Sequence, residues 1–324
     1  MAKERRMPEL GIVVPVHNES ENVQEFYGAV VAACKDLDFE ILFVNDGSTD
    51  NTALQCRKLA ESDLRVHLIS FVKNAGHQIA IHAGLSYARG EFVAMMDGDL
   101  QHPPDYLPIM VECARREGVD VVNMVKRRYK EGLIKRAFSA LFYRLFNSLT
   151  GGNLVPGASD FRLFTHRVHR VLLSLSERRP FYRAMIPALW FPYKNLEFDV
   201  PPRHAGTSSY TFLKSARMAS EAFLYHSTLP LHLMIIVGVL VASGAFIYAI
   251  ISIIVRLAGA ERIRPGWADI IVSVLMLGGL NLTLSGLIGK YIALLLEHEK
   301  RRPAYIVDEK LSTIQEPPEV DCED

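Results

Sequence analysis

Two long apolar runs in the last third of the chain constrain its fold more than any other feature. The run Leu231–Val255 contains no Asp, Glu, Lys or Arg, and the run Ala268–Leu296 is interrupted only by Asp269 and Lys290. Each run exceeds the ~20 apolar residues that a helix needs to cross a bilayer, and a buried core helix is seldom so long. We therefore expect two transmembrane helices, over residues 231–257 and 268–296.

The segments around these runs predict the orientation of the chain in the membrane. The N-terminal sequence MAKERRMPEL is charged and no apolar stretch follows it, so we do not expect it to act as a signal peptide. Three basic residues at positions 300–302 follow the second run, and three arginines lie between the runs, so the excess of cytoplasmic positive charge is moderate. We expect a multi-pass protein of the inner (cytoplasmic) membrane, with residues 1–228 and both termini in the cytoplasm.

The last segment, residues 299–324, is predicted to be a cytoplasmic tail. After Val307 it is acidic, contains Pro317 and Pro318, and shows no apolar periodicity. Such a composition does not bury enough apolar surface to fold, so we expect this tail to be largely disordered.

The first 228 residues alternate between short apolar runs and amphipathic segments. The predicted strands are Leu10–Val16, Glu40–Asn45, Val66–Ser70, Glu91–Met96 and Asp120–Met124. The predicted helices are Glu21–Cys34, Asp50–Glu61 and His77–Ala88. This alternation predicts an α/β domain with a mostly parallel, doubly wound sheet. Lys+Arg and Asp+Glu both number 36, and this zero net charge disfavours a nucleic-acid partner.

Four polar segments follow the first four predicted strands. They read PVHNE, NDGSTD, VKNAGH and DGDLQHPP, and they begin at Pro15, Asn45, Val72 and Asp97. Ligands of open α/β sheets bind beyond the carboxyl ends of the strands, where these segments converge. The chain contains neither GxGxxG after the first strand nor GxxxxGK[ST] anywhere, so an ordinary dinucleotide site and a P-loop are both disfavoured.

The fourth polar segment carries the most specific signal. Asp97 and Asp99 flank Gly98, and two carboxylates so close repel one another unless a cation lies beside them. Gln101 adds a neutral oxygen, and oxygen ligands favour Mg²⁺ or Mn²⁺. We therefore expect a nucleotide whose diphosphate is held through a divalent metal. His77 does not form an i, i+4 pair with His82, so these two histidines do not predict a second metal site.

Two basic amphipathic segments lie at 132–149 and 210–225. The first combines Phe138, Leu141 and Phe142 on one face with arginines mostly elsewhere. Such a helix either lies in a membrane interface or packs against the sheet. Small residues in the second apolar run, such as Gly278 and Gly286, would also permit close helix contacts in a homo-oligomer.

The four motifs in combination resemble the inverting family-two glycosyltransferases of the GT-A fold. The resemblance runs from about Gly11 to Leu296 and is strongest to the polyprenyl-phosphate group, which includes dolichol-phosphate mannose synthase and bacterial bactoprenol glucosyltransferases. It implies a Rossmann-like domain that transfers a sugar from a nucleotide-sugar donor, with a UDP-sugar favoured, to undecaprenyl or dolichyl phosphate. The QxxRW signature of processive synthases is absent, which favours transfer of a single sugar.

The resemblance also implies roles for individual residues. It assigns to the nucleotide Pro15, His17, Asn18, Glu19, Asp46, Lys73, Asn74, Gly76 and Asp97. It assigns to the metal Asp97, Asp99 and Gln101. Catalysis is assigned to Asp99 and to Asp160, which would orient the acceptor or accept its proton. The acceptor phosphate is assigned to Arg127, Arg128, Arg162, Arg203 and Ser208.

Two positions depart from the family pattern. His17 stands where many relatives have Tyr, and Ser209 stands where the family usually has Lys. The second departure removes one cation from the expected phosphate or lipid site. Two other classes of function stay open at this point, a membrane glycosyltransferase with another lipid or glycan acceptor and a non-catalytic membrane scaffold.

Overall fold

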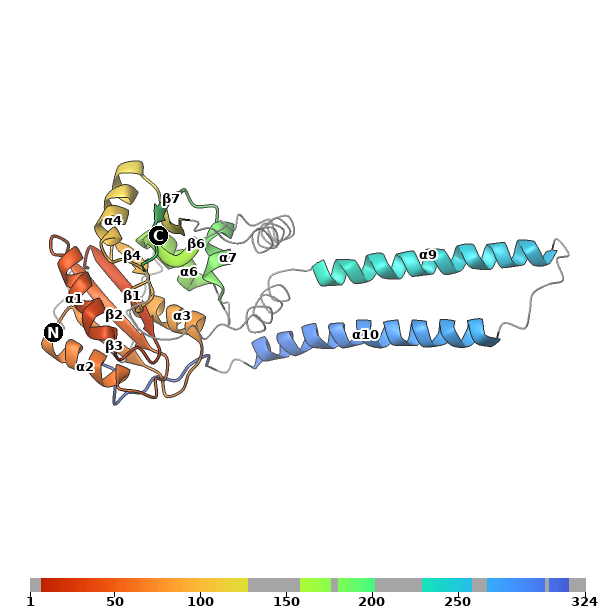
Figure 1. The fold of residues 1–324 in the computed structure, drawn as a ribbon, viewed down its shortest axis with the longest axis horizontal. Coiled ribbons are helices and arrows are strands. Elements are labelled where there is room, and N and C mark those ends of the chain that lie inside the picture. The colour runs from red at the N-terminus through yellow and green to blue at the C-terminus, as the bar shows by residue number, and fades with distance from the viewer. Residues whose placement is uncertain are drawn as a thin grey trace. The chain divides into compact units, whose positions relative to one another are not determined.

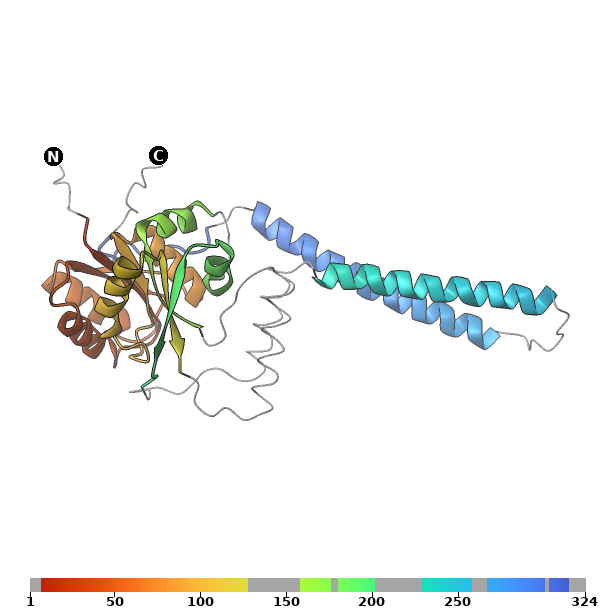
Figure 2. The same ribbon diagram turned by 90° about the horizontal axis from the view of Figure 1, so that it is seen from above.

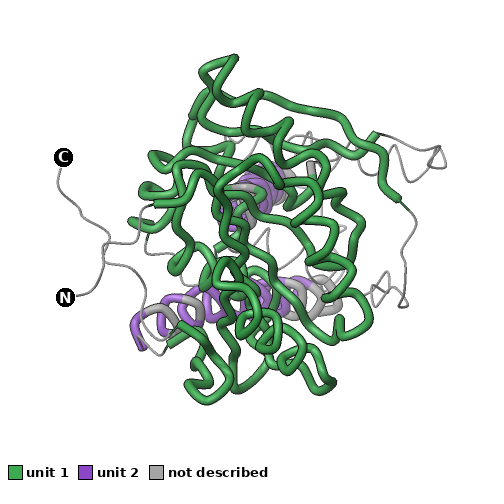
Figure 3. The backbone as a smooth tube through the Cα atoms, turned by 90° about the vertical axis from the view of Figure 1, so that its left-hand side faces the viewer, with its two compact units in different colours: residues 1–212, 303–324 green, residues 213–302 purple. Residues whose placement is uncertain are grey.

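The computed structural model describes residues 7–127, 158–175, 180–201, 229–257, 267–300 and 303–314. The chain divides into two compact units, Met1–Phe212 with Pro303–Asp324, and Leu213–Arg302 (Figure 3). Several predicted features lie outside the described residues: the amphipathic segments 132–149 and 210–225, Arg128, Arg203, Ser208 and Ser209.

The first unit is built on a seven-stranded sheet in the order β3-β2-β1-β4-β6-β5-β7 (Figure 1). Its parallel half consists of β1 (Leu10–Val16), β2 (Phe39–Asn45), β3 (Val66–Ser70) and β4 (Phe92–Met95). These strands coincide with the predicted ones to within one residue at each end. They are buried on both faces, as the continuous apolar runs of their sequences require.

The other half of the sheet contains two strands that the sequence did not predict. β6 (Ala158–Thr165) lies between β4 and β5 (Val121–Lys126) and runs antiparallel to both. β7 (Tyr193–Phe198) pairs with β5 in parallel at the edge. The α/β class and the mostly parallel sheet are therefore confirmed, with β6 as the strand that runs in the opposite direction.

Helices lie on both sides of the sheet (Figures 1 and 2). One apolar cluster is formed with α1 (Val23–Ala33), α2 (Thr52–Ser62) and α4 (Tyr106–Glu117). The opposite cluster is formed with α3 (His77–Tyr87), α6 (His166–Ser174) and α7 (Tyr182–Ala188). Successive residues of β1 alternate between the two, since Ile12 and Val14 join the first and Val13 joins the second.

The C-terminal segment Pro303–Ile314 packs along β3, which corrects the expectation that the chain is disordered after Val307. Val307 bridges to Phe71, and the backbone N–H of Asp308 donates to the carbonyl of Ser70 at 2.7 Å. The ring of Tyr305 stacks on Phe71 with centroids 4.7 Å apart. The segment covers the edge strand of the sheet, whose N–H and C=O groups would otherwise be unpaired. Residues 315–324 lie outside the described chain.

The second unit contains two long helices, α9 (Leu229–Leu257) and α10 (Trp267–Glu299). Large apolar side chains are exposed along them, for example Leu240 at 66% and Leu282 at 77%. Within the described part of the chain, no helix has the length and hydropathy needed to cross a membrane. The two predicted spans are therefore not confirmed.

Candidate active site

The loops that follow β2 and β3 are joined by the carboxylate of Asp46. Asp46 accepts hydrogen bonds from the backbone N–H of Ala75 at 2.6 Å and of Gly76 at 3.0 Å. Gly47 has a φ of +59°, and a Cβ there would lie 2.4 Å from the backbone nitrogen of Asn74. Only glycine lets the two loops approach so closely.

The loop after β1 completes this group of polar residues. Nδ1 of His17 donates to the carbonyl of Asp46 at 2.8 Å, and Asn18 accepts from the backbone N–H of Thr49 at 2.9 Å. The amide of Asn74 lies 3.3 Å from the same Asp46 carbonyl. The structure thus brings His17, Asn18, Asp46 and Asn74 together at one edge of the sheet.

Three further residues assigned to the nucleotide differ in their exposure. Lys73 is exposed in the loop after β3, and Glu19 is half-buried in the loop between β1 and α1, where its N–H donates to Thr52 Oγ1 at 2.9 Å. Pro15 is buried within β1 opposite Val44, so its ring belongs to the sheet. Pro15 therefore shapes the strand and is not a surface of the crevice.

Asp97 and Asp99 follow β4 at the same edge. The backbone N–H of Asp97 donates to Nδ1 of His102 at 2.9 Å, and Asp99 accepts from the N–H of Gln101 at 3.1 Å. A Cβ on Gly98 would lie 2.9 Å from Val16 Cγ1, so the turn is packed tightly against β1. These contacts fix the backbone from which the two carboxylates project.

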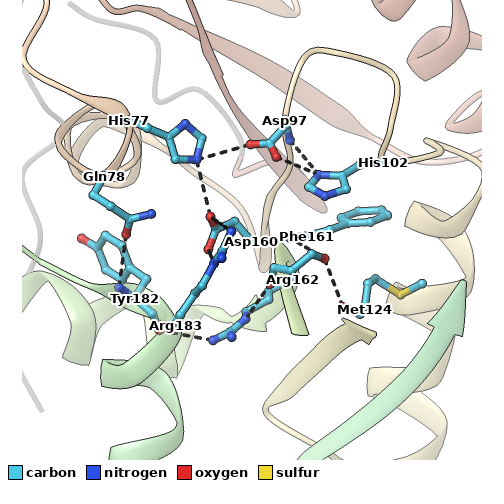
Figure 4. A network of polar contacts seen from close by, with 11 residues as sticks. His77, Gln78, Asp97, His102, Met124, Asp160, Phe161, Arg162, Tyr182 and Arg183 are labelled. Atoms are coloured by element: carbon cyan, nitrogen blue, oxygen red, sulfur yellow. Dashed lines mark hydrogen bonds and ion pairs between the residues drawn. The ribbon is translucent and has the colours of Figure 1, made fainter. Parts of the chain in front are cut away.

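Asp160 reaches the same place from the reversed strand β6. Met95 pairs with Arg162 in the β4–β6 ladder, and this register, continued by two residues, sets Asp160 opposite Asp97. Nε2 of His77, the first residue of α3, lies 3.4 Å from Asp97 Oδ1 and 3.5 Å from Asp160 Oδ2 (Figure 4). The three side chains come from three different elements and form one cluster.

Arg183 in the first turn of α7 makes a two-pronged ion pair with Asp160. Its Nε donates to Oδ1 and its Nη2 donates to Oδ2, each at 2.8 Å (Figure 4). Burial by itself would raise the pKa of Asp160, but the hydrogen bond from His77 and the charge of Arg183 outweigh it. The pKa of Asp160 therefore lies well below its usual range, and its carboxyl group is ionised.

Arg162 does not lie in the crevice, which corrects its assignment to the acceptor phosphate. Its side chain is 1% exposed, and its guanidinium donates to the carbonyls of Ser159 and Tyr182, each at 3.2 Å. These bonds connect β6 to α7, immediately beside Asp160 and Arg183. Arg162 thus connects β6 to α7 inside the protein and supports the site without facing it.

Arg127 directly follows β5, beside the edge strand β7. Its guanidinium pairs with Glu197 at 3.4 Å and with Asp199 at 3.1 Å. Both carboxylates belong to β7 or to the residues just after it. The structure therefore does not bring Arg127 into the cluster of Asp97, His77 and Asp160.

Asp97 has a carboxylate oxygen that fits a bound cation. Its Oδ1 is buried and accepts no hydrogen bond from the described residues, although His77 Nε2 lies 3.4 Å from it. A buried acceptor without a partner is costly unless a cation or water satisfies it. The described segments contain no group of three or more His, Cys, Asp or Glu side chains that would hold a metal. Asp97, Asp99 and Gln101 offer oxygen atoms of the kind that a hard cation prefers, and their role as metal ligands stays a prediction.

Comparison with known proteins identifies the family to which the chain belongs. The family described as Glycosyl transferase family 2 matches residues 11–173. An uncharacterized glycosyltransferase of Bacillus subtilis is 35% identical over 300 residues, which cover 91% of this chain and 92% of the relative. The chain belongs to glycosyltransferase family 2. It is a glycosyltransferase.

Other family 2 relatives have more specific names. The bactoprenol glucosyl transferase of Shigella phage SfV is 34% identical over 302 residues, covering 92% of this chain and 97% of that protein. A solved structure, glucosyl-3-phosphoglycerate synthase from Mycobacterium tuberculosis with Mn²⁺, UDP and phosphoglyceric acid, is 17% identical. The match covers 67% of this chain and 76% of the solved chain, with a TM-score of 0.49.

Three residues of this family 2 site were not predicted from the sequence: His77, His102 and Arg183. His102 follows the DGDLQ motif but carries no periodic or spacing signal of its own. Arg183 lies 23 residues after Asp160 in the chain and meets it only through the packing of α7 on β6. His82 hydrogen-bonds to the Tyr182 hydroxyl at 2.8 Å, whereas His77 faces the carboxylates, so the two histidines do not converge.

Proposed function

We propose that this family 2 glycosyltransferase moves one sugar from a nucleotide-sugar donor to a polyprenyl phosphate, with inversion at the anomeric carbon. A UDP-sugar is the favoured donor, and undecaprenyl or dolichyl phosphate is the acceptor. The observation that carries the proposal is the facing pair Asp97 and Asp160, which both lie within 3.5 Å of His77 Nε2, with Asp160 also bound to Arg183. The crevice thus offers a cation site for a diphosphate next to a fixed positive charge.

The donor side is formed by the loops after β1, β2, β3 and β4. Asp97, Asp99 and Gln101 would hold Mg²⁺ or Mn²⁺, and His17, Asn18, Asp46 and Asn74 would surround the nucleoside. When bound, the cation supplies charge stabilisation to the departing diphosphate. The protein contributes fixed positions, since Asp46 and Gly47 hold two of the loops in contact.

The names of the relatives and the second unit of the chain support a polyprenyl phosphate as the acceptor. Relatives that match 92% of this chain are named bactoprenol glucosyl transferases. A polyprenyl phosphate keeps its tail in a bilayer, so an enzyme that uses it must work at a membrane surface. We propose that α9 and α10 insert in the inner membrane. The uncharged run Leu231–Val255 and the exposed Leu240 and Phe246 on α9, at 66% and 69%, support this.

The proposed topology places the catalytic unit and both termini in the cytoplasm. A fluorescent protein fused after Asp324 should fluoresce, because it would stay in the cytoplasm. Alkaline phosphatase inserted between α9 and α10 should be active, because it would be exported. Activity of phosphatase fused after Asp324 would contradict the topology.

The proposed reaction is tested with purified protein in detergent, Mn²⁺ or Mg²⁺, and a panel of radiolabelled nucleotide sugars. Each sugar is offered with undecaprenyl phosphate, dolichyl phosphate or diacylglycerol. We expect label in a polyprenyl-phosphate product from one donor and none with diacylglycerol. Label in diacylglycerol alone would indicate a different acceptor class, and no transfer to any acceptor would favour a scaffold.

A further inference from the structure

The ion pair between Arg183 and Asp160 is asymmetric in its exposure. The Asp160 side chain is 3% exposed, whereas the Arg183 side chain is 44% exposed. The carboxylate therefore belongs to the protein interior, and the guanidinium belongs to the surface of the crevice.

The protein holds this pair in place from two sides. The buried Arg162 joins the carbonyl of Ser159, just before Asp160, to the carbonyl of Tyr182, just before Arg183, each at 3.2 Å. On the other side, the N–H of Tyr182 donates to the Gln78 side chain of α3 at 3.3 Å. The peptide groups just before Asp160 and Arg183 are thus held by hydrogen bonds, as a preorganised binding group requires.

The charges in the crevice decide between the two roles open to Asp160. A phosphate acceptor is already an anion, so it needs a cation to bind and has little need of a base. Asp160 is ionised and shares its two oxygens with Arg183, and His77 Nε2 lies 3.5 Å from one of them. A carboxylate with its lone pairs so engaged is a weak proton acceptor.

We propose that Arg183 binds the phosphate of the acceptor lipid, and that Asp160 is the positioning residue that orients its guanidinium. This inference rests on the proposed function. Arg183 takes the place of Arg162 and Arg127 as the expected phosphate ligand, because Arg162 is buried and Arg127 pairs with Glu197 and Asp199. The planar guanidinium matches phosphate oxygens in geometry as well as in charge.

The test is a set of steady-state measurements on the full chain in detergent with undecaprenyl phosphate. Arg183→Gln should raise the KM for the lipid phosphate at least tenfold, because charge-assisted hydrogen bonds are lost. The KM for the nucleotide sugar and the slow hydrolysis of the donor without acceptor should change by less than about threefold. Arg183→Lys should have a lipid KM between those of Arg183→Gln and the wild type, since lysine restores the positive charge but not the planar set of N–H donors.

Asp160→Asn separates positioning from base catalysis. If Asp160 only positions Arg183, Asp160→Asn should raise the lipid KM. The double variant of Asp160→Asn with Arg183→Gln should then have the same lipid KM as Arg183→Gln alone, because the two residues act as a unit. Base catalysis predicts a fall in kcat at unchanged lipid KM, with a pH profile that loses its acidic limb. Arg115→Gln is the matched control, since Arg115 on α4 pairs with Glu9 and Glu91, which precede β1 and β4 at the opposite ends of these strands from the site.

The outcomes distinguish the two levels of the proposal. An unchanged lipid KM in Arg183→Gln with normal donor hydrolysis would overturn the inference about Arg183 alone. A loss of kcat at unchanged lipid KM in Asp160→Asn would also overturn it. No transfer to the lipid phosphate by the wild type would overturn the proposed function and this inference with it.

Discussion

The Nδ1 atom of His102 accepts a hydrogen bond of 2.9 Å from the backbone N–H of Asp97. Because Nδ1 accepts, it carries no proton, and burial lowers the pKa of His102. The neutral ring stacks on Phe161 with centroids 5.1 Å apart, so its position is fixed by β6. His102 therefore links the strand that carries Asp160 to the turn that carries Asp97.

His102→Phe should raise the metal concentration that the enzyme needs for activity. Phe keeps the stacking on Phe161 but removes the acceptor for the Asp97 N–H, so the turn loses its anchor. We expect the Mn²⁺ concentration for half-maximal activity to rise roughly tenfold, as for other residues that orient a metal ligand. His67→Phe is the control, because His67 pairs with Glu40 at the far side of the sheet. An unchanged metal requirement in His102→Phe would show that Asp97 needs no such support.

Gly47→Ala should impair donor binding. The φ of +59° disfavours any Cβ, and the added atom would lie 2.4 Å from the backbone nitrogen of Asn74. We expect a loss of about 1–3 kcal/mol in stability and a raised KM for the nucleotide sugar. Gly28→Ala in α1, where a Cβ meets nothing within 4 Å, should be neutral or slightly stabilising. Equal effects of the two substitutions would contradict the loop contact.

Removal of the C-terminal segment should expose the edge of β3. The N–H groups of Leu68, Ser70 and Val72 donate to Thr313 Oγ1, Ser312 Oγ and the Ile306 carbonyl, at 2.8, 2.9 and 3.0 Å. Truncation after Arg302 should therefore accelerate amide exchange at these three positions. Truncation after Ile314 keeps the partners and should leave exchange unchanged. Slow exchange at all three amides in the shorter chain would refute the pairing.

His169 should make the protein less stable in mild acid. It is 3% exposed and its Nε2 donates to the carbonyl of Leu85 at 2.7 Å, and burial lowers its pKa to about 4. Between pH 6.5 and 4 the unfolded chain binds a proton that the folded chain does not, so stability falls as the pH falls. The loss is on the order of 3 kcal/mol at most.

The measurement for His169 is the melting temperature in detergent from pH 7 to pH 4. The wild type should lose more stability over this window than His169→Gln, which keeps a hydrogen-bond donor but does not titrate there. Parallel curves for the two proteins would show that His169 does not cause the acid sensitivity.

The donor side of the site was predictable because it depends on a local rule. Parallel strands place their carboxyl ends at one edge, so polar segments after Val16, Asn45 and Ser70 must meet. The acceptor side was not predictable in this way, since β6 is reversed and presents its first residues to that edge. Asp160 and Arg162 alternate with Phe161 along β6 and are both buried, but Asp160 meets the exposed Arg183 whereas Arg162 donates to two backbone carbonyls. Sequence spacing alone does not show which partner each of them will meet.

The C-terminal segment shows the same limit. Its composition is acidic, and it has no apolar period that would predict a strand. Its order comes from partners about 240 residues earlier in the chain, where Thr313 and Ser312 satisfy the amides of Leu68 and Ser70. Pairing of this kind depends on which edge of the sheet is open, which the segment itself does not encode.

The central claim is that one sugar passes to a polyprenyl phosphate in the crevice between Asp97 and Asp160. The most direct measurement is mass spectrometry and NMR of the lipid product made by the wild type and by Asp99→Ala from a UDP-sugar and undecaprenyl phosphate. We predict a lipid heavier by a single sugar, with an inverted anomeric centre, and no product from the folded variant. A retained anomeric configuration, a chain of several sugars, or full activity of Asp99→Ala would contradict the account.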